Sequence, residues 1–142
     1  MALFEGSAYL EAIENVLGLT PEVLDCLEAL ANASLLERPD PDEGRLGMLE
    51  TLREFALERL AEDPELPELR RSHALYLLRL AESAPDGLRG RQQQEWLRRL
   101  RHEEANLRVA MAWFVEQGDA EGAMRLAVSL RPYWLRVGAL EE

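Results

Sequence analysis

The most constraining feature of this sequence is a pair of short apolar segments, near Leu35–Arg38 and Arg45–Leu49, separated by an acidic turn. The turn contains proline, aspartate and glycine, the residues that reverse the chain most readily, so the two segments are predicted to pair as a β-hairpin. A helix is predicted to follow without a break, because apolar residues then recur at helical spacing. Its apolar face is formed by Leu52, Phe55, Ala56 and Leu60.

Two further helices are predicted before the hairpin. The segment SAYLEAIENVLG has apolar residues at helical spacing and ends at Gly18, a residue typical of helix ends. The next segment begins with Thr20 as N-cap and Pro21 in the first turn. Its apolar stripe consists of Val23, Leu24, Leu27, Leu30 and Ala31. Helix, helix, strand, strand and helix is the order of a winged helix or a close variant of it.

The charges of this first region argue against direct DNA binding, although its predicted shape is that of a DNA-binding domain. In a helix–turn–helix protein the second helix enters the major groove. Here that helix, Pro21–Leu36, contains Glu22, Asp25 and Glu28 and no arginine. The predicted turn adds further acids, with one arginine on either side: Asp40, Asp42 and Glu43, flanked by Arg38 and Arg45. Because affinity for DNA comes mainly from cations that neutralise phosphates, the duplex would repel this surface.

The second part of the chain is predicted to be entirely helical, which makes the fold class mainly α. Pro64 and Pro67 mark a junction, so we predict a winged-helix-like domain at 1–63 and a helical domain at 64–142. The net charge is −12 up to Arg70 and +1 from Arg71 onward, which also indicates two modules.

Within the helical domain the sequence predicts a helix over LRRSHALYLLRLAESA, a loop at APDGLRG and a long helix from Gln92 to about Gln117. Gly118 is expected to end that helix, and Asp119 to cap the last one. Tight turns of this kind between antiparallel helices are typical of helical-hairpin repeats, so an antiparallel bundle resembling tetratricopeptide repeats is expected.

Two groups of residues are candidate interaction sites. The first is a concentration of arginines at Arg89, Arg91, Arg98, Arg99 and Arg101. It is interpreted as a solvated helix face with local ion pairs, or alternatively as a patch for an acidic protein partner.

The second candidate is the end of the last helix, where no following helix covers the chain. An exposed apolar surface is predicted there, formed by Leu130, Tyr133, Trp134 and Val137. Helical repeats bury such faces only against neighbours. In a longer parent chain the next repeat would therefore cover this surface, whereas in isolation it would let two copies pair through the C-terminal helix.

Several chemistries are excluded by composition. All sixteen basic residues are arginines, so a lysine-containing phosphate loop and Schiff-base catalysis are ruled out. The single cysteine, Cys26, cannot form an internal disulfide. His102, Glu103 and Glu104 are adjacent on a helix and point in different directions, so no metal site is expected. With no convergent catalytic set, no cofactor motif, no signal peptide and no apolar run long enough for a membrane span, we expect a non-enzymatic cytoplasmic protein.

Three motifs occur in one order along the chain: GMLETLREFALERL, HEEANLRVAMAW and GDAEGAMRLAVSLRPYWLRVG. With them the chain resembles bacterial signal-transduction ATPases of the NB-ARC (STAND) class, including large transcriptional regulators of the SARP and LuxR types. The resemblance implies that an ATPase domain precedes Met1, and that the winged helix packs against nucleotide instead of DNA. Many members have Met-His-Asp where this sequence has Met48-Leu49-Glu50. The nucleotide-sensing histidine is therefore missing, and no nucleotide-binding residue is assigned.

The implied function is that of a regulatory module that couples a helical sensor region to the upstream ATPase domain, with a protein partner or that domain as its contact. The alternative is a stand-alone winged-helix DNA-binding regulator with a helical sensor domain.

Overall fold

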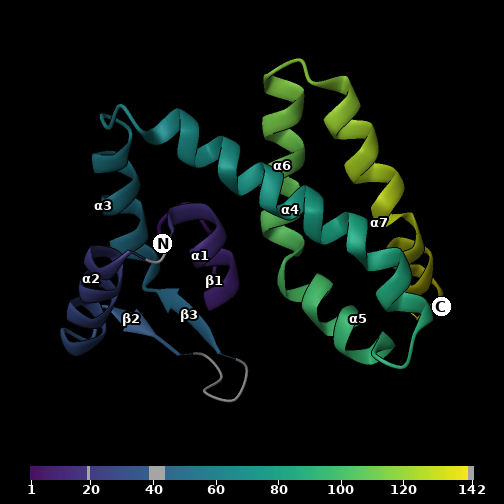
Figure 1. Cartoon of the computed structure of the whole chain (residues 1–142), viewed down its shortest axis with the longest axis horizontal. Coiled ribbons are helices and arrows are strands. Elements are labelled where there is room, and N and C mark those ends of the chain that lie inside the picture. Colours follow the sequence, from purple (N-terminus) through teal and green to yellow (C-terminus); the bar gives the residue numbers. More distant parts are fainter. Residues whose placement is uncertain (19, 39–43, 141–142) are drawn as a thin grey trace. The chain divides into compact units, whose positions relative to one another are not determined.

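The computed structural model describes residues 1–18, 20–38 and 44–140, with side chains through residue 138. These residues form two units, Met1–His73 and Ala74–Glu142, and the first contains the sheet whereas the second is helical (Figure 1). The division falls within helix α4 (Leu66–Arg89), whereas the prolines indicate a junction at residues 63 and 64. The mainly helical fold class with a small hairpin is confirmed.

The first unit contains a three-stranded antiparallel sheet. Strands β2 (Leu36–Glu37) and β3 (Arg45–Met48) form the predicted hairpin, and the acidic turn with Asp40, Asp42 and Glu43 lies outside the described residues. Strand β1 (Ser7–Tyr9) pairs with the other edge of β3, so β3 is central. Helical structure was expected for these three residues, and that expectation is wrong. Pairing with β3, which buries Ala8 completely, overrides the local helical pattern.

The end of the first helix before the hairpin and the start of the second follow their sequence signals. The first helix begins at Leu10 and not at Ser7, and the second ends at Asn32 and not at Leu36. Helix α1 (Leu10–Leu17) ends at Gly18, whose φ of 73° is readily adopted only by glycine. Helix α2 (Pro21–Asn32) begins at Thr20, whose Oγ1 accepts a hydrogen bond from the Val23 amide at 3.3 Å. No residue of α2 is buried, and its apolar stripe borders two hollows of about 400 and 470 Å³ instead of a filled core.

Helix α3 (Glu50–Leu60) differs most from its prediction. Phe55 was placed on the apolar face but is exposed, and the buried residue of this helix is Arg53. Its guanidinium lies 2.8 Å from the Glu50 carboxylate and 3.1 Å from that of Glu5. Arg53 therefore ties α3 to the N-terminal segment, a contact between residues 48 positions apart that helical periodicity cannot reveal.

His73 is a packing residue. Its ring is buried and meets Phe4 edge to face, with 5.0 Å between the ring centroids. Cys26, by contrast, is exposed on α2.

The second unit consists of the C-terminal part of α4 followed by α5 (Gln93–His102), α6 (Glu104–Glu116) and α7 (Ala120–Leu140). Two sequence expectations fail here. The segment APDGLRG is not a loop, because α4 continues through Pro85 to Arg89. The long helix expected from Gln92 to Gln117 is broken at Glu103, whose ψ of 1° separates α5 from α6.

Close packing accounts for the first of these failures. Gly87 lies against the indole of Trp96, and a Cβ at position 87 would collide with three atoms of that ring. The glycine thus lets α5 approach α4 closely instead of opening a loop. Leu88 and Leu100, from the same two helices, are fully buried in the core of this unit.

The turn between α6 and α7 is formed as predicted. Gly118 has a φ of 70°, and the Asp119 carboxylate accepts a hydrogen bond from the Gly122 amide at 2.9 Å. The two helices run side by side in opposite directions (Figure 1). No helix among the described residues is long and apolar enough to cross a bilayer.

Candidate functional site

Four of the five arginines in the predicted cluster are exposed, namely Arg89, Arg91, Arg98 and Arg101, but Arg99 is half-buried. Its Nη2 donates to the Tyr76 hydroxyl at 3.3 Å, and its Cζ lies 5.7 Å from the centre of the Trp96 ring. Arg99 therefore helps to pack the helices. Whether a partner binds the exposed arginines stays a prediction.

The predicted apolar surface at the end of α7 is only partly present. Leu130 and Tyr133 are 3% and 2% exposed, so the expectation that they lie on the surface is wrong. They point into the core because α7 packs against α6 along this side. Trp134 is 49% exposed, as expected, and Val137 is half-buried.

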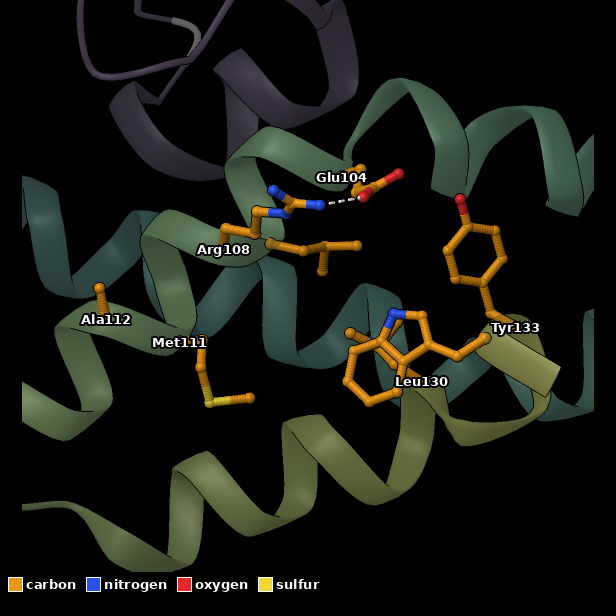
Figure 2. Close-up of a pocket in the computed structure, with 8 residues that line it drawn as sticks. Glu104, Arg108, Met111, Ala112, Leu130 and Tyr133 are labelled. Carbon is orange, nitrogen blue, oxygen red and sulfur yellow. Dashed lines mark hydrogen bonds and ion pairs between the residues drawn. The ribbon is translucent and has the colours of Figure 1, made fainter. Parts of the chain in front are cut away.

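Trp134 borders a pocket between α6 and α7 with a volume of about 510 Å³ (Figure 2). That size lies within the range of about 300–1,000 Å³ that is usual for small-molecule sites. Helix α6 contributes Glu104, Leu107, Arg108, Met111 and Ala112, and α7 contributes Leu130, Tyr133 and Trp134. The lining is mostly apolar, with polar groups near one end, as Figure 2 shows for Glu104, Arg108 and Tyr133.

The polar groups of the pocket interact with one another. Arg108 Nη2 lies 2.6 Å from Glu104 Oε1, one helical turn away. Burial of Tyr133 raises the pKa of its hydroxyl; the charge of Glu104 acts in the same direction and that of Arg101 in the opposite one. The structure thus brings Arg101 near Tyr133, two residues that the sequence assigned to separate candidate sites.

The size and mostly apolar lining of this pocket are suited to binding a small molecule. An apolar group could lie against Met111, Leu130 and Trp134 while a polar group meets Glu104 or Arg108 at the rim.

Sequence reasoning missed the pocket although most of its residues had drawn attention for other reasons. Leu130, Tyr133 and Trp134 were assigned to an exposed surface, and Glu104 was considered only as a metal ligand. Arg108 and Ala112 had no predicted role. The spacing of Glu104 and Arg108 does predict an ion pair along one helix face, but no local pattern predicts that this face borders a cavity.

The acidic surface of α2 is present as the sequence indicates. Glu22, Asp25 and Glu28 are all exposed. The pKa of Glu22 is lowered, first by a hydrogen bond from its own backbone amide and then by the Thr20 side chain, which favours the charged form. Of the two arginines that flank the hairpin turn, Arg45 is buried and donates from Nη2 to the Ser7 carbonyl at 2.7 Å. Arg45 is therefore unavailable to a phosphate.

Comparison with known proteins relates the whole chain to a segment of much larger proteins. It is 35% identical over 147 aligned positions to proteins of Mycobacterium tuberculosis strain H37Rv and Mycobacterium bovis, each named "putative HTH-type transcriptional regulator". The match covers all of this chain and 16% of each relative, so the chain spans about one sixth of their length. No known family model matches the chain, and neither does any solved structure.

Proposed function

We propose that this chain is a non-catalytic regulatory segment of a helix–turn–helix-type transcriptional regulator and acts in the cytoplasm. The observation that carries the proposal is the similarity along the whole chain to one sixth of larger proteins with that name. The pocket between α6 and α7 supports a sensing role, because its volume and mostly apolar lining suit a small ligand.

The finer part of the proposal is that the segment couples sensing to an upstream nucleotide-binding domain of the NB-ARC (STAND) class. An effector or protein partner would bind the helical unit, which has the character of the first tetratricopeptide-like repeats. The first unit would then contact the ATPase domain and not DNA. The exposed carboxylates of α2 and the buried state of Arg45 support this division of roles, since both weaken phosphate binding.

The second candidate function is direct DNA binding by the first unit, and a specific observation favours it. Only three positions, 18–20, separate α1 from α2, a spacing typical of a helix–turn–helix, and the name of the relatives includes that motif. The chemistry of α2 argues against this alternative, but a direct measurement is required to separate the two functions.

The proposal that the chain is a segment of a larger protein is tested by raising an antibody to the chain and immunoblotting the cells that produce it. We expect a band several times heavier than 16.2 kDa, as the coverage of the relatives implies. A native band at 16.2 kDa would contradict the proposal that the chain is part of a larger regulator.

DNA binding is tested by fluorescence anisotropy with a labelled random-sequence duplex, at low salt and at about 150 mM salt. The proposal predicts no retention at the higher salt concentration. The second function is correct if the duplex stays bound at the higher salt concentration and two further results hold. Replacement of Arg38 by glutamine should weaken duplex binding, whereas Arg131→Gln on α7 should not.

A further inference from the structure

Helix α7 presents a regular stripe of exposed residues on the side opposite its buried face. The stripe consists of Glu121, Met124, Val128, Arg131 and Leu135, with alternating spacings of three and four residues. Met124, Val128 and Leu135 are 64%, 71% and 63% exposed, and the two charged residues are exposed as well. The buried face of the same helix, with Leu126, Leu130 and Tyr133, is already used in the core.

This spacing has a specific meaning in helix association. Residues that recur every 3.5 positions on average form a seam along which two helices can wind around each other, with side chains of one helix fitting between those of the other. The seam of α7 therefore matches the a and d positions of a coiled coil over two heptads. Three large aliphatic side chains held in water along one line are unfavourable unless they are covered.

The charges of the seam decide the relative direction of a second identical helix. A parallel pair would place Glu121 against Glu121 and Arg131 against Arg131, which is repulsive at both ends. An antiparallel pair that sets Met124 against Val128 of the second copy also sets Glu121 against Arg131. By two-fold symmetry the favourable ion pair then occurs twice.

Both charges are available for such pairing. Within the described part of the chain, Glu121 lies 3.9 Å from Arg125, whose guanidinium is held much closer, at 2.6 Å, by Glu82. Arg131 forms no ion pair among the described residues. Neither charge would need to give up a short contact in order to pair across an interface.

We propose that this α7 seam, Glu121–Met124–Val128–Arg131–Leu135, is the interface of an antiparallel homodimer of the chain. The contact is short, because the seam extends only from Glu121 to Leu135, and Pro132 within it cannot donate a backbone hydrogen bond to the Val128 carbonyl. One pair of helices of this length covers less than the roughly 1,200 Å² of a standard interface, so the dimer is weak and reversible.

The proposal is tested by sedimentation velocity over a concentration series. The wild-type chain should pass from 16.2 kDa toward twice that mass as the concentration rises into the high micromolar range. Glu121→Arg and Arg131→Glu should each weaken dimerisation about tenfold, because each replaces two attractions by two repulsions. Arg79→Glu, the same charge change at an exposed position of α4, is the matched control and should leave the dissociation constant unchanged.

The decisive step is to mix the two single variants. In a mixed dimer the two reversed charges face each other with opposite signs, and so do the two unreversed charges. An equimolar mixture should therefore dimerise at least as well as the wild type, whereas each variant alone should dimerise more weakly. The variants alter exposed residues, and circular dichroism verifies that they are folded. The proposal is wrong if the wild-type chain stays monomeric throughout. That result would leave the seam to another segment of a larger protein or to a different partner. It is also wrong if the dimer is insensitive to both substitutions, or if mixing restores nothing.

Discussion

Replacing Gly87 by alanine should destabilise the chain, although the same change in an ordinary helix interior is stabilising. Alanine is favoured over glycine in a helix by up to about 1 kcal/mol. At position 87 that gain competes with a steric conflict, since the new Cβ would meet Nε1, Cδ1 and Cε2 of the half-buried Trp96 indole. The ring is rigid and α5 is held through Leu100, so the conflict is relieved only by moving the helix or expelling the indole.

Overpacking of this kind costs roughly 1–3 kcal/mol, and an expelled indole would lose its burial as well. The conflict therefore outweighs the helix propensity, and we expect a net loss of about 1–2 kcal/mol. For a chain of this size the corresponding decrease in Tm is roughly 3–8 °C. Gly138→Ala is the matched control, because Gly138 also lies in a helix but nothing lies within 4 Å of its added Cβ. That variant should be equally stable or slightly more stable than the wild type.

The assay is urea unfolding followed by circular dichroism on the two single variants and on a Gly87→Ala/Trp96→Leu double variant. If the indole causes the cost, Gly87→Ala should be much less harmful in the Trp96→Leu background than in the wild type. A Gly87→Ala chain as stable as Gly138→Ala would refute the reasoning. An equal cost in both backgrounds would assign the loss to something other than Trp96.

Three further variants test other parts of the structure. Arg53→Met should cost about 2 kcal/mol in urea unfolding, because it removes the partly buried hydrogen bonds to Glu5 and Glu50, whereas Glu50→Gln keeps the Glu5 contact and should cost less. Thr20→Ala should cost about 1 kcal/mol through loss of the α2 cap, and Thr20→Ser, which retains a hydroxyl, should restore most of it. For Tyr133, burial raises the pKa, so its stabilising contribution is complete below the ordinary value of 10.0 and decreases as the pH rises above it. Tyr133→Phe should therefore flatten the loss of stability above pH 10, and an unchanged alkaline slope would show that Tyr133 is not the titrating group.

The features that the sequence predicts correctly are those decided within a few residues. Thr20 with Pro21 starts α2, and Gly118 with Asp119 ends α6 and starts α7, because a cap satisfies backbone groups that lie only two or three positions away. The hairpin follows from turn residues between two apolar segments in the same way. The predictions fail where the structure depends on contacts between residues far apart in the sequence. Strand β1 depends on β3, and the burial of Arg53 depends on Glu5, which lies 48 positions earlier.

The α6–α7 pocket and the α7 seam also depend on contacts that the local sequence does not determine, and both involve the single helix α7. Helix α7 has two apolar stripes on opposite sides, one with Leu126, Leu130 and Tyr133, the other with Met124, Val128 and Leu135. Both fit a helical period, so periodicity shows that α7 has two faces to cover but not which one α6 takes. Once α6 packs on Leu130 and Tyr133, Trp134 lies at the edge of that contact and borders the pocket, and the second stripe faces water. Assigning the exposed surface to Leu130 and Tyr133 was therefore a choice of the wrong face on a helix that was otherwise predicted correctly.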